Sequence, residues 1–184
     1  HNGEEIPIYI QTPKLNNFND LGKTLKNFIE LELDKEHVNF YEFLNTIDDS
    51  NIYNTHYNSE NWFDQKLPMD IIDDFYKTNI KMTKYNSAPI VKFKISCSKK
   101  CQIFGNNLET INPEIVKKNV KIVSIIELEG IKFFKQKFEP VWNVLQLRAF
   151  VDVKNNSECL IKEEYFSDHE DSKDNKDTFI IYFR

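Results

Sequence analysis

The sequence predicts a mostly β fold with an inserted helical segment. Residues 90–95 alternate strictly between two faces, the pattern of a half-buried strand. Residues 138–153 carry the longest strand signal of the chain. Upstream of both, residues 35–51 place apolar side chains at the three-to-four spacing of an amphipathic helix. The chain has 184 residues, 40% of them hydrophobic, which is enough for the core of a single domain.

Short elements are expected on both sides of this helix. Residues 6–10 and 26–33 are strand candidates that open the sheet, and Asp34 can cap the helix. The polar residues 53–61 are expected to separate it from a second, shorter helix at 67–75, which has a proline in its first turn.

The second half of the chain is expected to be almost entirely strand. Residues 101–104 are predicted to return as a hairpin partner of strand 90–95, and residues 112–116 to form one helical turn. Residues 122–128 and 131–134 form a dense β pattern with a bend at Gly130.

Charge is strongly segregated in this acidic chain. The net charge is −5, yet residues 76–104 hold seven lysines and no acid. Because a local cluster of one sign can hold an anion, a phosphate backbone is the first partner to consider. The simpler alternative is a solvated surface.

The strand predicted at 138–153 has two different faces. One is aliphatic and is expected to pack; the other is aromatic and polar and is expected to meet a flat ligand. The aliphatic face comprises Val141, Leu145, Leu147, Ala149 and Val151, and the other face comprises Phe138, Trp142, Gln146, Arg148 and Phe150.

Residues 125–147 resemble the closing strands of a family of small proteins in large nucleocytoplasmic DNA viruses. The shared pattern is a hairpin of glycine, a hydrophobic residue, an aromatic residue and Phe, followed by lysine, Phe, and a Trp with a later glutamine. Residues 9–15, 61–63 and 89–95 fall in the order of that family, so the resemblance spans roughly residues 9–151. Lys132 departs from it, because the family often has an aromatic residue there, which would be a stacking platform.

That family is similar to phage-type single-stranded-DNA-binding proteins. The resemblance implies an oligonucleotide/oligosaccharide-binding (OB-fold) barrel. It also implies a function: coating single-stranded DNA during viral-type DNA replication or recombination, largely independently of sequence.

The residues themselves offer what such binding needs, a cationic groove and aromatic faces for the bases. The candidate groove cations are Lys92, Lys94, Lys99, Lys100, Lys132, Lys135, Lys137 and Arg148. The candidate stacking residues are Phe134, Phe138, Trp142, Phe150 and Tyr85. The alternative for Phe138 and Trp142 is the core, because aromatic residues on a closing barrel strand usually fill the interior.

The sequence divides into a binding domain, residues 1–162, with a helical insertion near 35–77, and an acidic tail, residues 163–184, with a β-prone end. Residues 163–177 carry seven acids against two lysines. Such a tail can compete with DNA for a basic groove or recruit replication proteins. Residues 178–184 are either that docking end or a last strand, which would pair within the barrel or with another subunit in a homo-oligomer.

Enzyme, cofactor and membrane functions find no support in the sequence. There is no glycine-rich phosphate loop, zinc protease motif or nucleophile elbow, and no apolar run of the roughly 20 residues that a spanning helix needs. Three cysteines leave an odd thiol, which favours free thiols in a reducing, intracellular compartment such as the host cytoplasm, viral factory or nucleus. No metal is expected. The rival function is a virion structural or assembly protein that acts through protein contacts.

Overall fold

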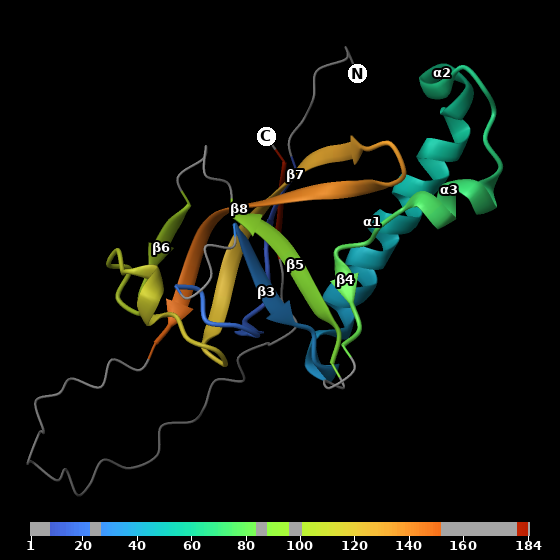
Figure 1. Ribbon diagram of the computed structural model, residues 1–184. Helices are drawn as coiled ribbons and strands as arrows, with labels where there is room; N and C mark the ends of the chain where they lie inside the picture. The colour runs from blue at the N-terminus through green and yellow to red at the C-terminus, as the bar shows by residue number, and fades with distance from the viewer. Residues whose placement is uncertain (1–7, 23–26, 84–87, 96–100, 152–179, 184) are drawn as a thin grey trace, which may run out of the picture.

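The computed structural model describes residues 8–22, 27–83, 88–95 and 101–151 and the backbone of 180–183. Five strands close into a barrel (Figure 1): β2 Leu15–Asn17, β3 Phe28–Glu32, β5 Ile90–Ile95, β7 Lys121–Phe133 and β8 Phe138–Phe150. Around the barrel β2 pairs with β3, β3 with β5, β5 with β8, β8 with β7 and β7 with β2. Only the β5 and β8 pair is parallel among these. This is the closed barrel of the OB-fold, as the family resemblance implies.

Further strands extend the sheet beyond the barrel. β1 Ile8–Gln11 pairs with β7, and β9 Ile180–Phe183 pairs with β1, so part of the β-prone end at 178–184 is a strand. β4 Ile80–Lys81 pairs with β5, and β6 Gln102–Phe104 pairs with β8. The acidic residues 163–177 lie outside the described part of the chain, as does the proposed boundary at 162.

The predicted hairpin between strand 90–95 and residues 101–104 is wrong. β6 runs parallel to β8 instead. The reason lies in the pairing of β5, because β3 occupies one edge along its length while β4 and β8 take the two ends of the other edge. β6 therefore pairs with β8, at residues just beyond those of β8 that pair with β5.

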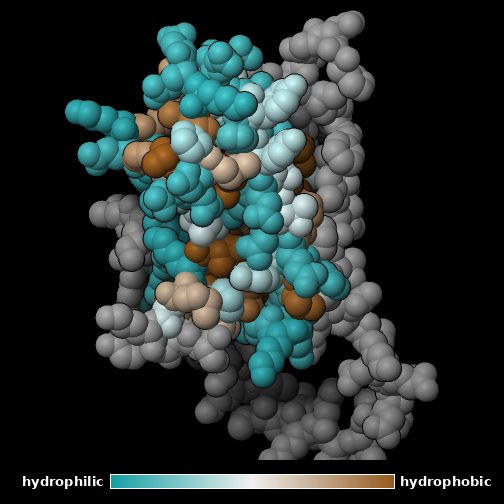
Figure 2. All heavy atoms as spheres, turned by 90° about the vertical axis from the view of Figure 1, so that its right-hand side faces the viewer, coloured by the Kyte–Doolittle hydropathy of each residue, from teal (hydrophilic) through white to brown (hydrophobic). Residues whose placement is uncertain are grey.

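The helical insertion lies between β3 and β5 and stands at one side of the barrel (Figure 1). It comprises the short 3-10 turn Lys35–His37, α1 Val38–Tyr57, α2 Ser59–Phe63 and α3 Met69–Phe75. The Asp34 side chain accepts a hydrogen bond from the Glu36 amide, so it caps the 3-10 turn, whereas α1 itself begins after His37 without a side-chain cap. The insertion side is mainly hydrophilic, with small hydrophobic areas between (Figure 2).

α1 is longer than the sequence predicts. The polar stretch after residue 51 was expected to end the helix, but the helix continues to Tyr57. Ile52 on this extension packs against the cluster of Ile72, Tyr76 and Phe138, and the buried Thr55 hydroxyl donates to the Asn51 carbonyl. Tertiary packing of a few side chains thus outweighs the weak helix propensity of the asparagines.

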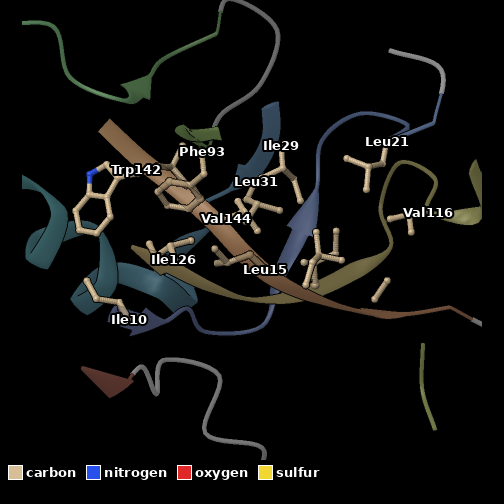
Figure 3. Close-up of a cluster of buried hydrophobic side chains, with 14 of the residues drawn as sticks. Ile10, Leu15, Leu21, Ile29, Leu31, Phe93, Val116, Ile126, Trp142 and Val144 are labelled. Carbon is tan, nitrogen blue, oxygen red and sulfur yellow. The ribbon is translucent and has the colours of Figure 1, made fainter. Parts of the chain in front are cut away.

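The main core fills the barrel (Figure 3). Side chains from all five barrel strands meet there, and Phe93 of β5 lies beside Trp142 of β8 with ring centroids 6.3 Å apart. Trp142 is 2% exposed and Phe138 is 4% exposed. Trp142 is therefore part of the main core, and Phe138 is part of a second buried cluster with Ile72 and Tyr76, so both are core side chains, the alternative that the sequence left open.

A bulge explains why the predicted faces of β8 are only half right. Pairing passes from Ile125 with Gln146 to Ile126 with Val144, so Leu145 is an extra residue. An extra residue shifts the alternation by one and exchanges the two faces. After the bulge Leu147, Ala149 and Val151 are buried as predicted, but before it Phe138, Trp142 and Val144 point inward. The predicted packing of Val141 is wrong for this reason.

Candidate nucleic-acid interface

A groove of about 400 Å³ crosses the outer surface between β5, β4 and the hairpin that joins β7 to β8. We call it the lysine groove, because six lysines line it: Lys77, Lys81, Lys92, Lys94, Lys132 and Lys137. Glu139 is the one acid among its described lining residues. Such a concentration of positive charge in a concave surface favours a polyanionic ligand.

The β5 lysines face the groove because of strand geometry. Phe93 points into the core and is fully buried, so its neighbours Lys92 and Lys94 point outward, which confirms the predicted alternation. Lys77 and Lys81 come from the segment between α3 and the end of β4. Neither is among the groove cations predicted from the sequence, although both belong to the acid-free segment 76–104.

Two phenylalanine rings are exposed in the lysine groove. Phe28 is 39% and Phe134 is 44% exposed. The Lys92 ammonium lies 3.9 Å from the centre of the Phe28 ring, and the ammonium groups of Lys132 and Lys137 lie 5.2 and 4.9 Å from that of Phe134. Phe28 is not among the stacking residues predicted from the sequence. The alternating buried positions Ile29, Leu31 and Leu33 were the signal that places it outside.

Aromatic rings hold the β7–β8 hairpin in place from the side of the insertion. The Phe134 amide donates to the Lys137 carbonyl at 2.8 Å and closes the turn. Phe133 contacts Trp62, Phe63 and Phe138, with ring centroids 5.9, 5.4 and 5.2 Å away. The helical insertion therefore supports the segment that presents Phe134 and its lysines.

Asp48 of α1 ties the insertion to the edge of the lysine groove. Its two carboxylate oxygens accept hydrogen bonds from Tyr76 and Thr78, each at 2.5 Å, and Thr78 lines the groove. Burial raises the pKa of the Asp48 carboxyl above its usual value of 3.8, against the opposing effect of the two hydroxyls. Burial also raises the pKa of Tyr76, so its hydroxyl stays protonated and donates.

We expect the stability that Asp48 provides to fall as pH rises from 3.8. A raised pKa means that the folded state binds the proton more tightly than the unfolded state, so raising the pH through the interval between the two values lowers the free energy of unfolding. Asp48→Asn removes this titration. Urea unfolding across this interval should show that the free energy of unfolding of the parent falls relative to that of Asp48→Asn as the pH rises. A difference that is constant with pH, or that shifts toward the parent, would contradict the assignment.

Glu139 weakens the positive field of the lysine groove. Its carboxylate accepts from the Lys137 ammonium at 2.6 Å, and both side chains are partly exposed. Half-exposed pairs contribute little to stability, so the main effect of Glu139 is to occupy a groove cation.

Glu139→Gln should therefore strengthen the binding of an anionic strand by about threefold at low salt, because it frees Lys137. Titration of a fluorescent oligo(dT) measures this, and the gain should shrink as salt increases. Glu114→Gln, at an exposed residue outside the lysine groove, is the matched control. Equal affinities for the parent and Glu139→Gln would show that the pair does not limit Lys137.

The structure brings together only some of the residues that the sequence singled out. Lys92, Lys94, Lys132, Lys137 and Phe134 line the lysine groove, whereas Lys135 is exposed at the hairpin tip. Trp142 borders the groove but is only 2% exposed, and Phe138 is buried and does not line it, so neither offers an exposed ring for stacking. Arg148 and Phe150 lie on a different surface. Lys99, Lys100 and Tyr85 lie outside the described residues.

Metal, thiol and membrane features add nothing to this site. Among the described residues no group of three or more His, Cys, Asp or Glu is placed to hold a metal. Burial raises the pKa of the free Cys101 thiol to about 11, which keeps it protonated and unreactive at neutral pH. None of the helices within the described ranges is long and apolar enough to span a membrane.

The fold is similar to solved structures of phage proteins. The single-stranded DNA-binding protein from bacteriophage Enc34 is 14% identical, with a TM-score of 0.51 over 84% of this chain and 87% of that chain. Its C-terminal truncation is 12% identical, with a TM-score of 0.52 over 78% and 86%. The single-stranded DNA binding protein gp2.5 encoded by bacteriophage T7 is 8% identical, with a TM-score of 0.50 over 84% and 97%. At these identities the similarity establishes the fold alone.

Sequence comparison reaches less far than structure. No curated protein matches this chain. Residues 24–168 match a family of unknown function, DUF5871. Since the match covers most of the chain, this protein belongs to the DUF5871 family.

Proposed function

We propose that this protein binds single-stranded DNA without enzymatic activity and largely without sequence preference. The lysine groove carries this proposal, because six lysines and two exposed phenylalanine rings share one concave surface. It lies over β5 and beside the β7–β8 hairpin, with Phe28 contributed by β3. These are the second and third barrel strands and the last hairpin, the surface that OB-folds use for oligonucleotides.

A DNA strand can replace the contacts that the lysines and aromatic rings of the groove make with one another in the free protein. In the free protein, lysine ammonium groups cover both exposed rings. A cation at an exposed ring is worth about 0.5–1 kcal/mol, whereas a stacked base is worth about 1–3 kcal/mol. A base therefore displaces the lysine, which can then neutralise a phosphate. Because every base has a flat face, this mode of binding tolerates any sequence.

The broader role that we propose is coating of single-stranded DNA during viral-type DNA replication or recombination. The fold similarity to phage proteins described as single-stranded DNA-binding supports it. The acidic residues 163–177, which precede β9, are proposed to recruit replication proteins, and the protein is proposed to act inside the cell and to form homo-oligomers. The virion or assembly function is the alternative that the following experiment addresses.

Gel shifts with oligo(dT) and with duplex DNA at several salt concentrations test the proposal. Single-strand binding by six lysines predicts that log K falls with log salt with a slope of about −4. We expect tighter binding to oligo(dT) than to duplex, since stacking needs unpaired bases. No binding, or binding without salt dependence and strand preference, would refute the proposal and favour a protein that acts through protein contacts.

A further inference from the structure

A second hollow lies on the outer face of the barrel, at the carboxyl-terminal end of β8. It has a volume of about 470 Å³, is bordered by β1, β6, β7 and β8, and shares no described lining residue with the lysine groove. β8 runs past both sites: residues 139–142 line the lysine groove, and residues 146–148 and 150 line the second hollow. Figure 1 shows this end of β8 beside β6, away from the helical insertion.

Cations gather around the half-buried ring of Phe150 in this hollow. The Lys14 ammonium lies 4.1 Å and the Arg148 guanidinium carbon 4.9 Å from the ring centre. Lys121 is directly opposite Phe150 in the pairing of β7 with β8. A cation at a ring occupies a face on which a base could stack, and the base stack is the stronger contact. A base can therefore displace the cation, which remains close enough to meet a phosphate.

Arg148 is held in position but keeps unused donors. Its Nη2 donates to the Asn106 carbonyl at 2.6 Å, while its Nε is buried and has no hydrogen-bond partner. A guanidinium has five N–H donors in a fixed fork that matches phosphate oxygens. A buried donor without an acceptor costs free energy, so a rotation of the guanidinium that brings its Nε to an oxygen of a ligand would be favourable.

The remaining lining suits a nucleotide. Gln11 and Gln146 contribute amides, which offer both a donor and an acceptor to a base edge, and no described lining residue is acidic. Phe104 adds a second aromatic side chain at the rim. An apolar side chain of another protein would fill the same space but would leave the Arg148 donors unpaired.

We propose that this hollow, the Phe150 site, is a second contact for the same DNA strand that occupies the lysine groove. The inference rests on the proposed function and extends it from one contact surface to two. Val141 of the groove and Arg148 of the Phe150 site are seven residues apart on β8, roughly 23 Å along the strand. A short oligonucleotide therefore fills one site, and only a longer one reaches both.

The test compares two oligonucleotide lengths, about 3 and about 30 thymidines, which lie below and above the roughly 4–16 nucleotides of a usual OB-fold site. We expect Phe150→Leu to weaken binding of the long oligonucleotide about tenfold, through loss of a stack, and to leave the short one unchanged. Lys14→Gln should lower the salt slope for the long oligonucleotide by about 0.7. Lys118→Gln is the matched control, because its ammonium covers the Phe18 ring at 4.9 Å outside both sites.

Thermal unfolding of each variant separates a folding defect from a binding defect. Lys14→Gln changes a side chain outside the core, so it tests the site with little risk to folding. Equal weakening of both lengths by Phe150→Leu in a folded variant, or of neither, would overturn the second contact. A parent protein that binds neither length would overturn the proposed function itself. If Phe150→Leu and Lys14→Gln weaken binding of the long oligonucleotide and leave binding of the short one unchanged, both proposals are supported.

Discussion

Replacing Lys92 and Lys94 together by glutamate should weaken the binding of oligo(dT) by about 100-fold. The double variant changes the charge of the lysine groove by four units, and each exposed ionic contact is worth up to about 1 kcal/mol. Both side chains point away from the core. Phe93, which lies between them in the sequence, is fully buried. Lys94 is exposed and Lys92 is partly buried on the outer surface, where substitutions usually change stability by no more than about 0.5 kcal/mol.

The β3–β5 register sets the control for this variant. Glu30 lies directly opposite Lys92, so a glutamate at position 92 would face a like charge, which costs up to about 1 kcal/mol. Lys92→Gln with Lys94→Gln removes the positive charges without this repulsion and should reduce the salt slope by about 1.4. Lys117→Glu with Lys118→Glu makes the same charge change outside the groove and should leave affinity nearly unchanged.

Fluorescence anisotropy at several salt concentrations gives both the affinity and the slope for these variants. If the folded groove variant binds as tightly as the parent, the outer face of β5 is not part of the DNA site. If the Lys117 and Lys118 control weakens binding to the same extent, net charge rather than the groove determines affinity.

Local periodicity predicted those parts of the fold that depend on neighbouring residues. The alternation in β5 placed Lys92 and Lys94 outside correctly, and the apolar stripe predicted the start of α1 to within a few residues. Pairing depends on residues distant in sequence. The predicted partner of β6 was therefore wrong. Both edges of β5 are paired with β3, β4 and β8, and the local sequence pattern of β5 does not reveal these pairings.

The candidate site shows the same limit. Sequence alone could not place the bulge at Leu145, because Val144, Leu145 and Leu147 are all apolar and do not show which residue is extra. Without it, Trp142 shares a face with Arg148 and Phe150; with it, Trp142 is in the core while the other two lie outside. A site drawn as one surface from the sequence is therefore two surfaces in the structure.

Trp142→Ala should lower the free energy of unfolding by about 3–5 kcal/mol, the usual cost of removing a large buried aromatic ring. The indole is 2% exposed, and its ring meets that of Phe93 at 66° and 6.3 Å. Near these rings β8 joins the parallel strand β5 and closes the barrel. For a chain of this size the loss corresponds to a melting temperature lower by roughly 10 °C.

Urea unfolding of three variants distinguishes a core side chain from a stacking platform. Trp142→Phe should recover much of the stability, because it retains a ring that packs against Phe93. Phe134→Ala, at a 44% exposed ring in the lysine groove, should show the opposite behaviour. We expect it to keep nearly all of its stability and to lose about tenfold in affinity for oligo(dT), since one stacked base is lost. A stable Trp142→Ala protein with weakened DNA binding would reverse these roles, because a ring that can be removed without loss of stability is not part of the core.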